Sequence, residues 1–190
     1  MKYYAYYGAA EDLSDDYTDL FILYMEAYYP GYERIFHNTK EHRIDILNGG
    51  AKESIRLSTA EEKSVKVRTL YDQNAVIHTA LMKNLADRLS PEVTIVFEDI
   101  MSLGDTPGQI LDVYEYFMRK KIYMAFETGK ALDTALILSI SGTYDPEIAK
   151  YIQLCIKAYC EEFTLKKNIN VRLNDKAQKE KKNCHEIYPV

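Results

Sequence analysis

The stretch from Pro91 to Phe126 constrains the fold of this chain more than any other part of its sequence. Val93–Phe97 is an apolar run without alternation, which is typical of a central strand covered on both faces. Thr106-Pro107-Gly108-Gln109 favours a helix start, because threonine can cap the helix, proline suits its first position and glutamine completes a capping box. Ile122–Phe126 is again apolar. The stretch therefore predicts a strand, a loop, a capped helix and another strand.

The rest of the chain continues this alternation. Arg43–Leu47 and Glu53–Ser58 flank Asn48-Gly49-Gly50 and predict a hairpin, because Asn-Gly favours the positive φ angles of a tight turn. Other expected elements are strands at Lys2–Tyr7 and Tyr32–His37, helices at about Asp15–Tyr28 and Asn74–Leu89, a candidate fifth strand at Ala135–Ser139, and a long helix from Asp145 to about Asn168. We expect an α/β layered domain with a mainly parallel sheet of four to five strands, flanked by helices and followed by a long C-terminal helix.

The long helix carries an apolar stripe. Its members recur at three- and four-residue steps and are Ile148, Ile152, Cys155, Tyr159 and Phe163. A stripe of this kind at the end of a domain must cover either the domain's own core or a partner.

Charge is distributed unevenly along the 190 residues. The net charge of −5 argues against a protein that coats DNA along its whole surface. The segment from Leu165 to Lys182 nevertheless carries +5, which leaves about −10 for the remainder. Its cations are Lys166, Lys167, Arg172, Lys176, Lys179, Lys181 and Lys182. A basic segment on an acidic body indicates either a nucleic-acid contact or a solvated helix end.

Cysteine usage and the terminal sequence favour a cytoplasmic protein. Cys155, Cys160 and Cys184 are widely spaced and odd in number, which is typical of a reduced protein and not of a disulfide framework. The first residues show no signal-peptide pattern, and no apolar run reaches the roughly 18 residues of a membrane span. We therefore expect no membrane partner.

The order of motifs resembles the catalytic domain of serine recombinases, the resolvase/invertase family. The order begins with an N-terminal strand, the acidic Glu11-Asp12, an Ile35-Phe36 strand and a helix. It continues with the central strand, a Leu103-Gly104 loop, the capped helix, a strand and the long helix. The resemblance covers most of residues 1–170 and implies an insertion at 38–72. It implies a resolvase-like domain over 1–144, a dimerisation helix over 145–168 with the apolar stripe as a homodimer interface, and a basic tail over 169–190.

The catalytic residues of that family are replaced here. The family begins Tyr-Ala-Arg-Val-Ser-Thr, and the matching stretch puts Tyr7 on the arginine and Ala9 on the nucleophilic serine. A shift of one residue would put Gly8 on the nucleophile instead. A further family arginine corresponds to Thr79, and the two arginines of the Leu-Gly loop correspond to Ser102 and Asp105.

These replacements argue against strand cleavage. Attack on a phosphodiester builds negative charge on the phosphorus oxygens, which arginine or lysine must stabilise, and an aspartate such as Asp105 would repel it. The resemblance therefore suggests a catalytically inactive recombinase homologue from a mobile element. It would act by dimerisation and by DNA binding through the seven cations of Lys166–Lys182.

Two alternatives stay open. One is an active recombinase or nuclease with a rearranged site, which would use Ser14 as the nucleophile or Glu98, Asp99 and Asp105 with a metal ion. The other is a small-molecule or nucleotide-binding α/β domain that shares only the architecture.

Recognisable ligand motifs are missing from the sequence. Neither His37, His42 and His78 nor the pair Cys184-His185 has the spacing of a metal site, and no Walker, GxGxxG or GxSxG motif occurs. No cofactor is therefore expected. No helix-turn-helix pattern follows the long helix, so we do not expect this chain alone to recognise a DNA sequence.

Overall fold

Strands and helices alternate along most of the chain. The computed structural model describes the backbone of residues 1–8, 15–58, 70–141 and 145–187, and the side chains of 1–8, 20–58, 73–139 and 145–166. The strands are β1 Tyr3–Gly8, β2 Glu33–Asn38, β3 Arg43–Asn48, β4 Ala51–Arg56, β5 Thr94–Phe97 and β6 Tyr123–Phe126. The helices are α1 Asp15–Tyr28, α3 Leu70–Arg88, α4 Pro107–Arg119, α5 Thr134–Ser141 and α6 Pro146–Ile187, with short 3-10 turns η1 Ile100–Leu103 and η2 Lys130–Leu132.

The strands form one six-stranded sheet in the order β4-β3-β2-β1-β5-β6. β2, β1, β5 and β6 are parallel, whereas β3 and β4 are antiparallel to their neighbours. The expected hairpin is confirmed, with Gly49 and Gly50 at positive φ angles of 54° and 90°. The expectation of a mainly parallel sheet with four to five strands is wrong, because a two-residue turn can join only antiparallel strands and so makes the sheet mixed.

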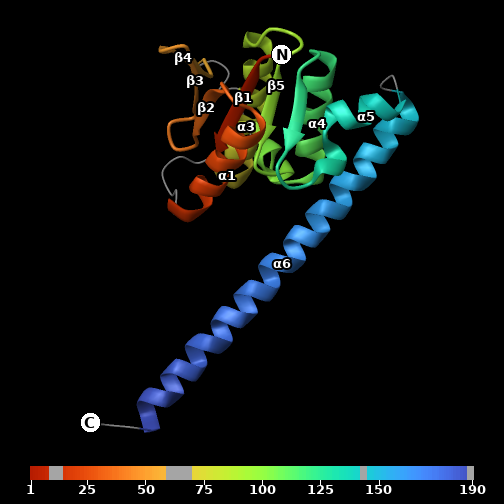
Figure 1. Cartoon of the computed structure of the whole chain (residues 1–190). Helices are drawn as coiled ribbons and strands as arrows, with labels where there is room; N and C mark the ends of the chain where they lie inside the picture. The colour runs from red at the N-terminus through yellow and green to blue at the C-terminus, as the bar shows by residue number, and fades with distance from the viewer. Residues whose placement is uncertain (9–14, 59–69, 142–144, 188–190) are drawn as a thin grey trace.

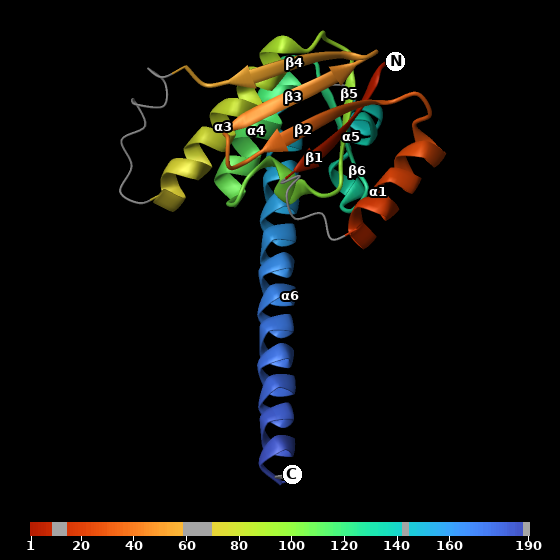
Figure 2. The same ribbon diagram turned by 90° about the vertical axis from the view of Figure 1, so that its left-hand side faces the viewer.

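Helices cover the two faces of the sheet in separate layers (Figures 1 and 2). On one face, α3, α4 and the first part of α6 enclose the larger core, to which β1 contributes Tyr4 and Tyr6. On the other face, α1 encloses a smaller core with Ala5 and Tyr7 of β1. Alternate residues of one strand therefore belong to different layers, as strand geometry requires.

The segment from β5 to β6 agrees with the sequence prediction. All four residues of β5 are buried, as expected of a central strand covered on both faces. The Thr106 hydroxyl accepts a hydrogen bond from the Gln109 backbone N–H at 3.3 Å, so Thr106 caps α4. The Gln109 side chain in turn accepts from the backbone N–H of Asp105 at 3.1 Å, one residue before the cap.

The candidate fifth strand at Ala135–Ser139 is wrong, because these residues belong to helix α5. The outer edge of β6, where another strand would pair, is occupied by side chains. The Thr134 hydroxyl accepts from the Met124 backbone N–H at 2.7 Å and donates to the Met124 carbonyl at 3.2 Å. The Asp133 carboxylate accepts from the Phe126 backbone N–H at 2.8 Å. These contacts satisfy the backbone groups that a further strand would need.

Helix α6 is longer than the sequence suggests. The carboxylate of Asp145 caps its start by accepting from the backbone N–H groups of Glu147 and Ile148, both at 2.9 Å. The expected end of the helix is near Asn168, but the helix runs to Ile187 and is 42 residues long in all. Most of the segment expected as a basic tail therefore belongs to α6. Its first part lies against the body and its far part projects away from it (Figures 1 and 2). Within the described parts of the chain, no helix combines the length and apolar character of a membrane span.

Candidate binding pocket at the carboxyl edge of the sheet

The carboxyl ends of β1, β2, β5 and β6 meet at one edge of the sheet because these strands are parallel. Ligands of α/β proteins usually bind at this edge. A polar pocket of about 470 Å³ lies there. It is lined by His37, Thr39, Lys40, His42, Asn74, His78 and Asp105. These residues come from the end of β2, the β2–β3 turn, α3 and the loop before α4, which are distant in sequence.

His37 forms the buried side of the pocket. Its side chain is 3% exposed, and its Nδ1 lies 2.8 Å from the hydroxyl of Tyr6, which is within hydrogen-bond distance. Burial, with smaller contributions from His78 and His42, lowers the pKa of His37 to about 3. Burial also raises the pKa of Tyr6. At neutral pH the pair therefore consists of a neutral imidazole and a protonated phenol.

His78 of α3 packs edge-to-face against His37. The ring centroids are 5.0 Å apart with an interplanar angle of 71°. Burial lowers the pKa of His78, although the charge of Asp105 partly opposes this. The Nε2 atom of His78 is buried and has no hydrogen-bond partner among the described residues. A buried ring nitrogen without a partner is costly, and a ligand could remove that cost.

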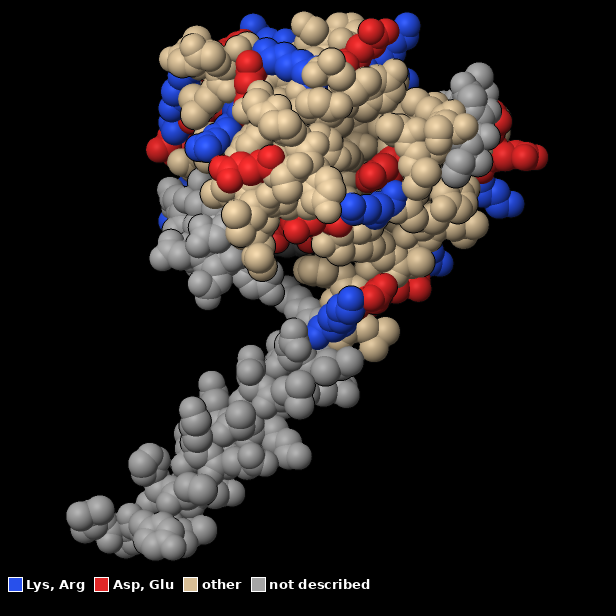
Figure 3. Space-filling view, viewed as in Figure 1, with Lys and Arg blue, Asp and Glu red and all other residues tan. Residues whose placement is uncertain are grey.

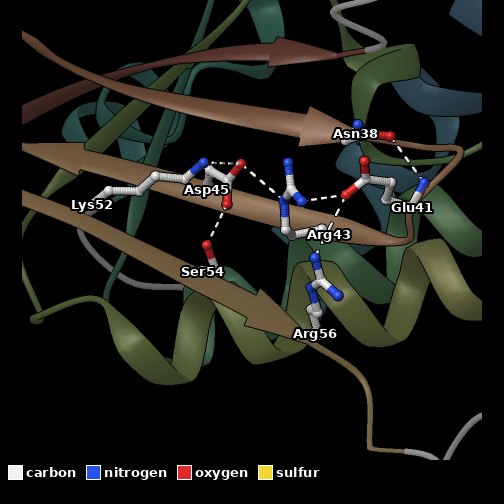
Figure 4. A network of polar contacts seen from close by, with 7 residues as sticks. All are labelled: Asn38, Glu41, Arg43, Asp45, Lys52, Ser54 and Arg56. Carbon is white, nitrogen blue, oxygen red and sulfur yellow. Dashed lines mark hydrogen bonds and ion pairs between the residues drawn. The ribbon is translucent and has the colours of Figure 1, made fainter.

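A network of charges fixes the turn that carries Thr39, Lys40 and His42 (Figure 4). The Asn38 side-chain oxygen accepts from the Glu41 backbone N–H at 2.9 Å. The Glu41 carboxylate pairs with Arg43 and, at 3.5 Å, with Arg56 of β4. His42 itself adopts a φ of 47°, a left-handed conformation that is uncommon outside glycine. The turn that carries these pocket residues is thus tied to the adjoining strands.

Asp45 is the buried centre of this network. Its carboxylate accepts from the Ser54 hydroxyl at 2.5 Å and from Arg43 Nε at 2.9 Å, and lies 3.1 Å from Lys52 Nζ. Burial by itself would raise the pKa of Asp45, but the hydrogen bonds and the two cations outweigh it and lower the pKa. The polar groups on this sheet face are therefore partnered with one another and serve mainly to hold the hairpin.

Among the described residues, the positions that the resemblance assigns to catalytic residues do not come together in one site. Tyr7 points into the smaller core, where its ring stacks on Phe36 at 5.1 Å. The Thr79 hydroxyl donates to the Ala75 carbonyl within α3 at 3.1 Å, and Ser102 lies in η1. Of these positions only Asp105 lines the pocket. Ala9 and the alternative nucleophile Ser14 lie outside the described residues.

The acidic group expected from the sequence is divided in the structure. The Asp99 carboxylate accepts from the Met101 backbone N–H at 2.7 Å and caps η1. Burial, followed by the charges of Asp99 and Glu127, raises the pKa of Glu98. Asp105 instead lines the histidine pocket. Among the described residues, no three His, Cys, Asp or Glu side chains are placed so that they could hold a metal ion together.

Most of the apolar stripe on α6 covers the chain's own core. Ile152 is fully buried, and Ile148, Cys155 and Tyr159 are partly buried against the same core. Phe163 is 39% exposed. In this single chain the Ile152 side chain lies inside its own domain, and the dimer interface expected along the stripe stays a prediction.

The seven cations of the basic segment all lie on α6. Lys166 is exposed and pairs with Glu162 at 2.6 Å. The others are Lys167, Arg172, Lys176, Lys179, Lys181 and Lys182, whose side chains are outside the described set.

No sequence motif predicts the pocket. His37 and His78 belong to separate elements with a hairpin between them, and their spacing matches no motif. Only the parallel register of β1 and β2 and the packing of α3 bring them together.

Comparison with models of known protein families finds no match, and comparison with curated proteins finds no significant relative.

Proposed function

We propose that this chain is a recombinase-like protein that does not cleave DNA and that acts by binding DNA and a second copy of itself through α6. The observation that carries the proposal is the continuity of α6. One helix runs from a segment packed on the body into the basic segment and projects from it (Figure 1). The basic segment, with +5, is thereby placed on a projecting part of α6, whereas the rest of the chain carries about −10.

The charge on the body favours contact through the arm. The space-filling view shows acidic and basic side chains interspersed over one face of the body, without a continuous basic patch among the described side chains seen there (Figure 3). DNA binding without base readout depends on lysine and arginine contacts to phosphates. The arm is therefore the better DNA contact, and its affinity should depend steeply on salt.

The lack of cleavage follows from the residues that occupy the family positions. Tyr7 is committed to the smaller core and Thr79 to an intrahelical hydrogen bond, so neither can stabilise a phosphorane-like transition state. Asp105 adds a negative charge at the edge of the sheet. We therefore expect no nicking of supercoiled plasmid, with or without Mg²⁺; metal-dependent nicking would support the rearranged-nuclease alternative.

The second copy would bind beyond the buried part of the stripe. Phe163 is 39% exposed and Leu165 is 61% exposed, whereas Ile152 and Ile156, nearer the start of α6, are buried. A dimer that uses these residues and the far part of α6 needs no displacement of Ile152. It would also bring two basic segments side by side, so DNA could neutralise both.

DNA binding is tested by fluorescence anisotropy with a labelled duplex over a salt series. The test variant replaces Lys176, Lys179, Lys181 and Lys182 with glutamine in the full chain. The control variant replaces four exposed lysines elsewhere, Lys121, Lys130, Lys150 and Lys157. Each phosphate contact contributes a slope of about −0.9 to log K against log salt, so we expect the test variant to lose most of both affinity and slope. Equal losses in both variants would contradict the proposal.

A further inference from the structure

We propose that the pocket lined by His37, Lys40, Asn74 and His78 binds a small oxyanion, either free phosphate or a phosphate monoester. This proposal is independent of the contacts proposed for α6. The pocket and the basic segment of α6 are separate sites, and each can be removed by substitution without altering the residues of the other.

The chemistry of the lining favours a ligand rich in hydrogen-bond acceptors. Lys40 offers an ammonium group, Thr39 a hydroxyl, Asn74 an amide and the histidines ring N–H groups. Among the described lining residues, Asp105 is the one carboxylate. A phosphate oxygen accepts from all of these donors, and the hydroxyl of a phosphate monoester's organic group can donate to Asp105.

Burial makes these donors effective. His37 is 3% exposed and held by Tyr6, so its ring is fixed before a ligand arrives. The buried Nε2 of His78 has no partner among the described residues, so a ligand oxygen would satisfy it. In a preorganised site of this kind, ligand binding loses little free energy to the ordering of side chains. The volume of about 470 Å³ falls in the range of small-molecule sites.

Binding should be linked to proton uptake. At neutral pH the formal charges of Lys40 and Asp105 cancel, and burial keeps His37 and His78 neutral. The groups that face the His78 ring are His37 from β2 and Asp105 from the loop before α4, and His37 also faces Tyr6 and His42. A dianion next to His78 favours the imidazolium form, so affinity should rise as the pH falls.

The test is NMR of the histidine ring protons in the full chain, which has four histidines. Each signal is assigned by its His→Gln variant. Phosphate is titrated against a chloride control of equal ionic strength. We expect saturable shifts for His37, His42 and His78 and none for His185, which lies near the end of α6. Absence of saturable shifts, or equal shifts of His185, would overturn the proposal.

Two variants and a second anion sharpen the test. Lys40→Gln should weaken phosphate binding by about tenfold, as expected for loss of a charge-assisted hydrogen bond, whereas Lys157→Gln on exposed α6 should not change it. Sulfate stays doubly charged from pH 8 to pH 6, so any rise in its affinity over that range comes from the protein alone, and we expect such a rise. Equal effects of the two lysine variants would contradict the site.

The α6 variant separates this proposal from DNA binding. Replacing Lys176, Lys179, Lys181 and Lys182 should leave the phosphate shifts intact. Loss of those shifts in this variant would place the anion on α6 and overturn the pocket assignment. Loss of DNA binding with retained phosphate shifts would support both sites.

Discussion

Tyr6 and Tyr7 show how one position in a strand decides the role of a residue. Tyr6 enters the larger core and reaches His37 with its hydroxyl. Tyr7 enters the smaller core and stacks on Phe36. Both are buried, and Tyr6 contacts His37, which lines the pocket. The abundance of tyrosine could be read from the sequence, whereas the face on which each ring lies depends on strand register.

His37 should make the protein sensitive to acid. Its pKa is lowered from 6.5 to about 3 in the folded state, so as pH falls below about 6.5 the unfolded chain takes up a proton that the folded chain does not. Stability contributed by the neutral form is therefore lost progressively between those values, by roughly 3 kcal/mol from pH 7 to pH 4. We expect His37→Gln, which can still accept from Tyr6, to reduce this loss.

Urea unfolding at pH 7 and pH 4 measures the effect. The free energy of unfolding should fall less on acidification in His37→Gln than in the wild type. His185→Gln serves as the control, because His185 lies on the far part of α6, and it should leave the pH dependence unchanged. An identical loss in wild type and His37→Gln would show that His37 is protonated as easily in the folded state as in the unfolded one.

Among the elements, local chemistry made the hairpin and α4 predictable and α5 unpredictable. Asn48-Gly49-Gly50 fixes the β3–β4 turn, and Thr106 with Gln109 fixes the start of α4. The apolar run at Ala135–Ser139 suits a strand or a helix, and periodicity cannot separate the two in so few residues. Asp133 and Thr134 favour the helix, because their side chains occupy the edge of β6 where a further strand would pair.

Packing of α6 on the body can be tested with two neighbouring residues of that helix. Ile152 is fully buried, so Ile152→Ala should lower the free energy of unfolding by about 2 to 5 kcal/mol through lost burial and cavity formation. Leu154 is 59% exposed, so Leu154→Ala should change it by less than about 0.5 kcal/mol. Denaturant unfolding of both variants measures this. Similar losses of unfolding free energy in the two variants would mean that α6 does not pack on the body as described.

For the whole molecule, the order of elements allowed the α/β class to be predicted, but not the arrangement of the site. Alternating strands and helices indicate a layered fold. The six-stranded mixed sheet follows once the hairpin is added to the edge next to β2. The histidine pocket needs the completed sheet and the packed α3, so no local pattern could reveal it. The length of α6 was underestimated because its far part lacks a clear apolar stripe.

Hydrogen exchange should divide α6 into two parts. Amides from about Ile152 to Cys160 lie where buried side chains hold the helix, so they should exchange slowly. Amides beyond Lys166 should exchange fast in dilute protein, because a helix without tertiary packing is marginally stable. Raising protein concentration or adding DNA should slow them if the proposed contacts form. Slow exchange along the whole helix in dilute protein would contradict this division.

The packing of the first part of α6 on the body determines where the far part of the helix lies. The Cys160 thiol lies 3.9 Å from the Met101 sulfur in η1, and the same loop continues to Asp105 in the pocket. At 1.5 Å per residue, the helix beyond Cys160 extends for roughly 40 Å. A tilt of α6 by about 10° about its packed part would move its far end by roughly 7 Å, which is more than the pitch of one helical turn. The position of the basic segment therefore depends on the angle at which α6 packs on η1.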